Sequence, residues 1–206
     1  MKTSFLSAWL ALAFTCGSSS LHATPVTFLA GGADAAAIQG TVDAFRAALG
    51  PLNANVAGSF GSGRREINWD GVPNGLAAPR NLPANFFNTN SPRGAVFSGP
   101  GTGFQVSGNA GVAPTRFDNL NPTYSTQFAT FSAERLFTSL GSNVYDVLFF
   151  VPGSLTPALI RGFGSVFTDV DTANTTSIEY FDALSNSLGT YFAPSVTGDQ
   201  TPILES

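Results

Sequence analysis

The chain has 206 residues, of which only 11% are charged, and its 13 acidic residues outnumber its 9 lysines and arginines. This balance argues against nucleic-acid binding, because neutralising backbone phosphates requires a basic surface. Aromatic residues make up 12% of the chain, including 19 phenylalanines, which is typical of a protein with a packed core and not of a disordered one.

The first 23 residues have the pattern of a secretory signal peptide. Lys2 precedes an apolar run over residues 5–14, and a small residue, Ala23, stands at the expected cleavage point. The run is much shorter than the roughly 20 apolar residues needed to span a bilayer. We therefore predict a signal peptide over residues 1–23, secretion, and no transmembrane span in the mature chain. A lipoprotein starting at Cys16 is the alternative, although the residues before it are bulky for such a site.

Cleavage would remove the only cysteine, histidine, lysine and methionine of the chain. The mature chain then has no thiol, imidazole or ammonium side chain, so we expect neither Ser-His-Asp nor Cys-His catalysis. Zinc and copper sites of the usual His/Cys kind are excluded for the same reason. Residues 24–206 are within the usual size of one folded domain, and we predict a single domain.

The predicted elements begin with a short strand at residues 24–30 and an amphipathic helix at residues 34–49. The apolar residues with helical spacing are Ile38, Val42, Phe45 and Leu49. Because Gly40 weakens the middle of the helix, we expect its firmer part to run from Val42 to Leu49, with Thr41 as the N-cap. Gly50 and the proline after it end the helix.

Residues 63–75, with the sequence GRREINWDGVPNG, predict a strand followed by a turn at the Asn-Gly pair. The two faces of this strand are expected to carry Arg65, Ile67 and Trp69 on one side and Glu66, Asn68 and Asp70 on the other. One face is therefore predicted to be partly apolar and the other to hold two carboxylates and an amide.

Further along, two short strands are predicted at residues 95–98 and 103–107, joined by a glycine-rich turn. The stretch 144–193 contains four strand-like runs rich in β-branched and aromatic residues, and we predict that they form the main sheet. Abundant phenylalanine, glycine and asparagine favour an all-β sandwich, in which aromatics fill the space between sheets and the small residues form turns.

Several segments together resemble a family of secreted bacterial proteins with jelly-roll-like sandwiches. These segments read GRREINWDGV, NFFNTNSPRG, PGTGFQVSG and GFGSVFTDVDTANTTSIEYFDALSNSLGTYFAP. The second half is also similar to extracellular proteins with a C-terminal sorting tail. The resemblance implies an all-β, jelly-roll-like (galactose-binding-like) β-sandwich with one short N-terminal helix. Because family members continue into further strands, we expect a chain ending at Ser206 to lack the last strands of its sandwich.

The segment NWD suggests a ligand site in which Trp69 stacks on a sugar ring while Asn68, Asp70 and the nearby Glu66 form hydrogen bonds. One alternative is a tryptophan buried in the core. Another is a network in which the neighbouring arginines pair with the carboxylates and fix the loop. A glycosidase pair is a poor fit, because Glu66 and Asp70 would lie roughly 13 Å apart on a strand, beyond the about 5–9.5 Å that such enzymes use.

A second candidate site is a calcium site formed by Asp169, Asp171, Asn174 and Asp182. The first two flank one residue at a predicted strand end, and calcium prefers carboxylate, amide and carbonyl oxygens. The alternative is a set of turns in which these side chains accept hydrogen bonds from backbone N–H groups.

We therefore predict a secreted, non-catalytic cell-surface or matrix module that binds carbohydrate or another extracellular polymer, with structural calcium. A purely structural surface or biofilm protein is the alternative, and a carboxylate-only glycoside hydrolase is the third hypothesis. The four tyrosines are further candidates for a carbohydrate-binding surface: Tyr124, Tyr145, Tyr180 and Tyr191.

Overall fold

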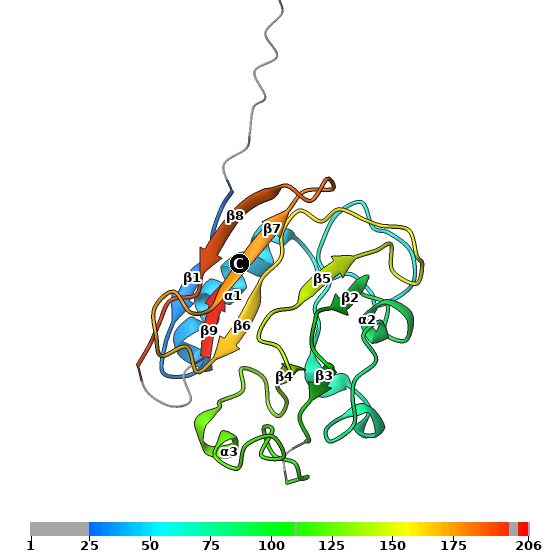
Figure 1. The fold of residues 1–206 in the computed structure, drawn as a ribbon. Helices are drawn as coiled ribbons and strands as arrows, with labels where there is room; N and C mark the ends of the chain where they lie inside the picture. The colour runs from blue at the N-terminus through cyan, green and yellow to red at the C-terminus, as the bar shows by residue number, and fades with distance from the viewer. Residues whose placement is uncertain (1–24, 110, 198–201, 206) are drawn as a thin grey trace, which may run out of the picture.

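The computed structural model describes residues 25–109, 111–197 and 202–205, so the predicted signal peptide lies outside the described part (Figure 1). Short strands in small antiparallel sheets dominate it. The sheets are β1-β9-β6, β2-β5, β3-β4 and β7-β8. The strands are β1 (Leu29–Gly31), β2 (Ala95–Ser98), β3 (Gly103–Val106), β4 (Phe137–Leu140), β5 (Asp146–Phe149), β6 (Ser165–Thr168), β7 (Ser177–Phe181), β8 (Ser187–Phe192) and β9 (Pro202–Glu205).

Helices are few and mostly short. The helical elements are α1 (Ala35–Leu49), η1 (Trp69–Gly71), η2 (Asn74–Leu76), α2 (Phe86–Thr89) and α3 (Tyr124–Gln127). Within the described ranges, none of these helices has the length and apolar character needed to cross a membrane. The all-β prediction therefore holds at the level of small antiparallel sheets with few helices, and among the described residues no sheet has more than three strands.

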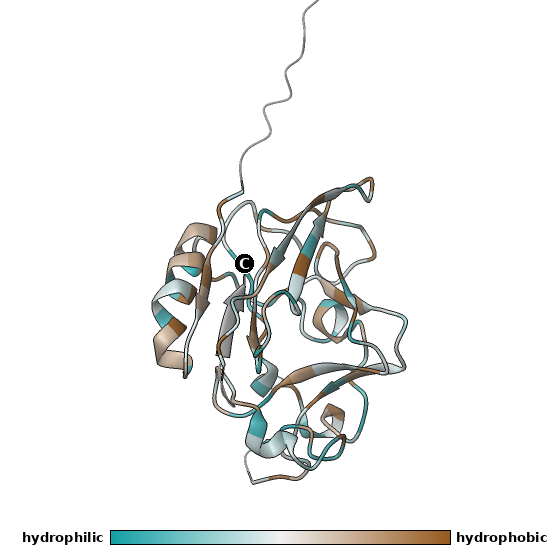
Figure 2. Cartoon of the chain, turned by 60° about the vertical axis from the view of Figure 1, so that its left-hand side comes forward, coloured by the Kyte–Doolittle hydropathy of each residue, from teal (hydrophilic) through white to brown (hydrophobic). Residues whose placement is uncertain are grey.

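Helix α1 lies along the β1-β9-β6 sheet, as Figures 1 and 2 show from two directions. Its buried residues Ile38 and Val42 pack against Ala30, Phe131 and Val166. This confirms the predicted helix and its core-facing side. The predicted N-cap was wrong, because the side chain of Asp34, not Thr41, accepts the hydrogen bond from a first-turn N–H. The exposed Gly40 weakens the helix without ending it.

The larger core is aromatic and lies around α2, β2, β3 and β4. Its fully buried members include Phe87 and Val106, which are 1% and 0% exposed. The other buried members are Val72, Leu82, Phe86, Ala95, Phe97 and Phe104. Half-buried Trp69, Phe137 and Tyr145 pack against them. This core lies beside two loop regions that line pockets, as described below.

The strand predicted within residues 63–75 does not form. Only one isolated bridge, between Leu52 and Arg64, occurs there, and the chain then enters the 3₁₀ turns η1 and η2. The cause is local, because the side chain of Asn68 accepts a hydrogen bond from the N–H of Asp70 and caps η1. The alternation of apolar and polar residues therefore did not reflect two faces of a strand.

The predicted pairing of strands was also wrong. The stretch 144–193 supplies β5, β6, β7 and β8, but these strands fall in three different sheets. Likewise, β2 and β3 do not form a hairpin, because β2 pairs with β5 and β3 pairs with β4. Strand propensity is local, whereas the partner of each strand is set by which side chains the pairing buries.

Replacing Phe87 by alanine is expected to destabilise the protein by about 3–5 kcal/mol, because it removes a fully buried ring and leaves a cavity. The matched control is Leu184→Ala, which changes a side chain that is 82% exposed and should alter stability by less than about 0.5 kcal/mol. Urea denaturation of both variants measures the difference. Equal effects of the two substitutions would contradict the placement of the core.

Candidate functional site

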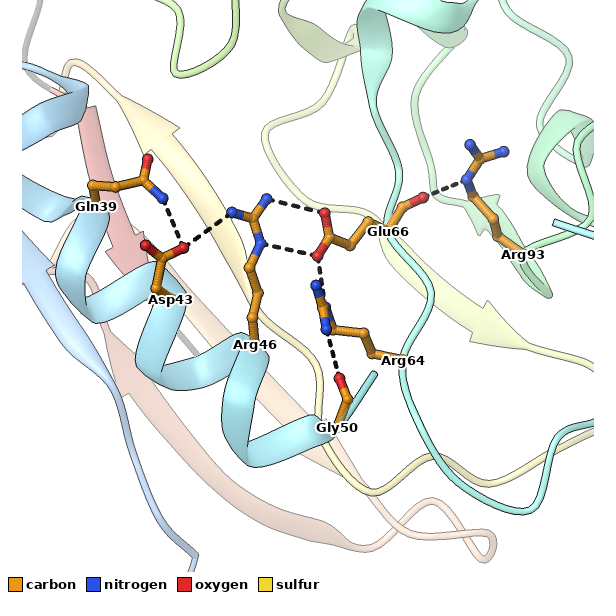
Figure 3. Close-up of polar contacts among 7 residues, drawn as sticks. All are labelled: Gln39, Asp43, Arg46, Gly50, Arg64, Glu66 and Arg93. Atoms are coloured by element: carbon orange, nitrogen blue, oxygen red, sulfur yellow. Dashed lines mark hydrogen bonds and ion pairs between the residues drawn. The ribbon is translucent and has the colours of Figure 1, made fainter. Parts of the chain in front are cut away.

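The carboxylate of Glu66 lies between two guanidinium groups (Figure 3). Arg46, on the last turn of α1, donates from Nε to Oε1 at 2.9 Å and from Nη2 to Oε2 at 3.0 Å. Arg64 donates from Nε to Oε1 at 2.7 Å and also reaches the carbonyl oxygen of Gly50. These contacts join the end of α1 to the segment 63–75, in the bidentate geometry that favours arginine.

This arrangement keeps Glu66 ionised. Partial burial alone would raise the pKa of the carboxyl group, but the hydrogen bonds and charges of Arg64 and Arg46 outweigh burial and hold the pKa below its ordinary value. A carboxylate held in this form is a poor general acid. Its position matches the Arg–carboxylate network that the sequence offered as one alternative.

Two other arginines tie the same segment to the loop before β2. Arg65 donates to the carbonyl oxygens of Pro92 and Gly58. Arg93 donates to the carbonyl oxygen of Glu66. The segment 63–75 is therefore fixed on both sides by guanidinium groups that bind backbone carbonyls.

The indole of Trp69 is engaged in the aromatic core. Its ring stacks on Phe137 at a centroid distance of 4.5 Å, and Phe87 contacts it edge-on at 5.5 Å. Phe97 packs against it at 6.0 Å. These contacts correspond to the alternative of a tryptophan that packs in the aromatic core.

Asp70 faces a different partner from Glu66. Its Oδ1 accepts hydrogen bonds from the backbone N–H groups of Glu134 and Arg135, at 3.2 and 2.9 Å. The four predicted ligand residues Glu66, Asn68, Trp69 and Asp70 are thus close in sequence, but their side chains have different partners. Their described contacts hold separate parts of the structure together.

The contacts of Asp70 lead to a buried arginine that the sequence did not single out. The side chain of Arg135 is only 2% exposed. Its guanidinium donates to the Oδ1 atoms of Asn109 and Asn74 and to the carbonyl oxygen of Val72. Burial lowers the pKa of Arg135, while the charge of Asp70 opposes this shift. The network fixes the position of Asn109 at the end of the β3–β4 ribbon.

Asn109 is part of a cavity of about 210 Å³, which we call the polar pocket. The pocket is lined by Gly108, Asn109, Gly111, Thr115, Arg116, Ala133 and Glu134. Arg116 and Phe117 have φ angles of 44° and 69°, a left-handed conformation that is rare outside glycine and frequent at ligand sites. No pattern in the sequence indicated this pocket, because two separate loops meet to form it.

The predicted calcium ligands lie on both sides of β7. Asp169, Asp171 and Asn174 precede this strand, and Asp182 follows it. Asp182 accepts hydrogen bonds from the N–H groups of Leu184 and Asn186, as in the alternative of a turn. In the described ranges, no group of three or more acidic, histidine or cysteine side chains could hold a metal ion. Calcium binding by the loop 169–174 stays a prediction. It can be tested by comparing the melting temperature of the protein in CaCl₂ and in EDTA.

Comparison with known proteins adds no further assignment. No protein-family model, curated protein or solved structure matches the chain.

Replacing Glu66 by glutamine is expected to cost about 1–2 kcal/mol of stability at neutral pH, because charge-assisted hydrogen bonds to two arginines become neutral ones in a partly exposed site. The lowered pKa means that the stabilisation is complete above the ordinary value of 4.5 and is lost as the pH falls through the folded-state value. The difference between wild type and Glu66→Gln should therefore shrink in acid. Denaturant melts from pH 3 to pH 7, with Glu179→Gln as the exposed control, test this; a difference independent of pH would contradict it.

Proposed function

We propose that the chain is a secreted, non-catalytic module that binds a hydroxyl-rich extracellular polymer, such as a polysaccharide, through the polar pocket. The proposal rests on two oppositely charged side chains that line one pocket without forming an ion pair with each other. Arg116 and Glu134 line the same pocket, and among the described residues no ion pair joins them, while Nη1 of Arg116 donates to the carbonyl oxygen of Phe128 at 2.6 Å. A ligand between them must accept hydrogen bonds from one and donate hydrogen bonds to the other.

Sugar hydroxyls satisfy both requirements, because each hydroxyl donates one hydrogen bond and accepts others. Thr115 adds a hydroxyl to the lining, while the amide of Asn109 is held by Arg135 and Asn74. A volume of about 210 Å³ lies below the roughly 300–1,000 Å³ of drug-sized pockets, which suits one ring of a longer chain. The polymer would then extend over the surface on either side of the pocket.

The contacts of the two predicted acids favour binding over hydrolysis. Glu66 is paired with Arg46 and Arg64, and Asp70 accepts backbone hydrogen bonds near β4. Neither is aimed with the other at one bond of a substrate, as an acid and a nucleophile or base must be. A structural surface protein without a ligand remains the alternative outcome of the binding test.

The jelly-roll type of sandwich is also part of this proposal. Such a fold has eight strands in two sheets, and nine short strands occur in the described residues, in sheets of two or three. An experimental structure that joins these small sheets into two facing layers would support it.

Binding should depend on Glu134 and not on Trp69. In a glycan-array screen followed by calorimetry with the best oligosaccharide, Glu134→Ala is expected to weaken binding about 10-fold or more, because a hydrogen bond to a charged group is worth about 1.5–3 kcal/mol. Glu179→Ala removes the same side chain outside the pocket and should leave affinity within about 2-fold. Trp69→Phe, which keeps a ring in the core, should change the melting temperature more than the affinity.

The proposal fails if no glycan binds the folded chain, which would favour the structural role. It also fails if Trp69→Phe abolishes binding while Glu134→Ala leaves it unchanged, because the site would then lie at the segment 68–70.

A further inference from the structure

A second cavity lies at the other end of the β3–β4 ribbon, and we call it the glycine pocket. Its volume is about 200 Å³. It is lined by Gly99, Gly101, Thr102, Gly103, Phe104, Ser139, Val144 and Tyr145. No charged side chain lines it, so its chemistry differs from that of the polar pocket.

The hydroxyl of Tyr145 is the feature of this pocket that needs an explanation. The ring is held edge-on by Phe97, Phe104 and Phe137, with centroid distances of 5.6–6.1 Å. Burial raises the pKa of Tyr145, so the group stays a neutral hydroxyl. Within the described part of the chain its hydroxyl forms no hydrogen bond that would satisfy it. Tyrosine hydroxyls in largely apolar surroundings usually find a partner, and this half-buried side chain lines an open cavity.

The rim of the pocket is fixed by close backbone packing. A Cβ atom on Gly101 would lie 2.2 Å from the carbonyl oxygen of Leu140, and Gly103 has a φ angle of 147°. The N–H of Thr102 donates to the same carbonyl at 2.7 Å. Side chains are therefore excluded at these positions, and the turn is held against β4 in one conformation.

The lining has the two-sided character of a sugar-binding surface. Phe104, Val144 and the ring of Tyr145 offer apolar area, while Thr102, Ser139 and the hydroxyl of Tyr145 offer polar atoms. Sugar rings have apolar C–H faces and hydroxyls at their edge, so they match such a lining. The absence of charge from the lining selects for an uncharged ring over a uronic acid or amino sugar.

We propose that the glycine pocket is a second saccharide-binding site, which takes one uncharged sugar ring and hydrogen-bonds it through the hydroxyl of Tyr145. The proposal extends the proposed function, since it shares its ligand class, but the two sites have no lining residue in common. Gly103 lines the glycine pocket and Gly108 lines the polar pocket. The two residues stand at opposite ends of β3, about 17 Å apart along an extended chain. One chain with both sites can hold two sugar units and cross-link polymer strands.

Glycine amides separate the two sites in one NMR experiment. The ¹⁵N-labelled chain is titrated with three uncharged probes, cellotetraose, maltotetraose and galactobiose. At least one probe is expected to give saturable shifts at Gly99, Gly101 and Gly103, which belong only to the glycine pocket. Shifts at Gly108 and Gly111 report the polar pocket separately, so failure of either site is seen independently of the other.

Tyr145→Phe keeps the aromatic ring and removes the hydroxyl. It should weaken binding at the glycine pocket about 3- to 10-fold, with the rest of the spectrum unchanged. Tyr191→Phe makes the same change on β8 and should have no effect. No saturable shift at the three glycines with any probe, or the same affinity in Tyr145→Phe and wild type, would overturn the proposal.

Discussion

The carboxylate of Glu66, held by Arg46 and Arg64, joins helix α1 to the segment 63–75. Arg46 lies on α1, which covers the β1-β9-β6 sheet, whereas Glu66 begins the segment that enters the aromatic core. Few other charges are available, because only 11% of residues are charged. Bidentate contacts at a part-buried carboxylate are among the stronger polar interactions, so this cluster adds a directional link between α1 and the segment 63–75 to the apolar packing of Ile38 and Val42.

The same segment supplies two further anchors within four residues. Trp69 enters the aromatic core, and Asp70 binds the backbone that leads into β4. The residues that look most like a ligand site in the sequence are therefore those that position the scaffold. The two cavities described above are lined instead by loop residues at both ends of the β3–β4 ribbon.

The aromatic core connects these loops physically. Trp69 stacks on Phe137, Phe137 stacks on Phe104, and both phenylalanines contact the ring of Tyr145. A chain of rings thus runs from the segment 63–75 to the glycine pocket. Close-packed aromatic side chains have few alternative arrangements, so the aromatic wall of the glycine pocket is held in one conformation.

Elements with local signals could be predicted from the amino-acid sequence. The helical spacing of Ile38 and Val42 gave the side of α1 that is buried, and the strand-like runs predicted β2, β3 and most of the later strands. The partner of each strand, and the partners of the charged side chains Arg64 and Glu66, are seen only in the folded chain. The periodicity of a helix is a pattern among residues a few turns apart, so a short stretch of sequence shows it. Strand pairing, and pockets such as that of Asn109 and Glu134, depend on residues far apart in the chain.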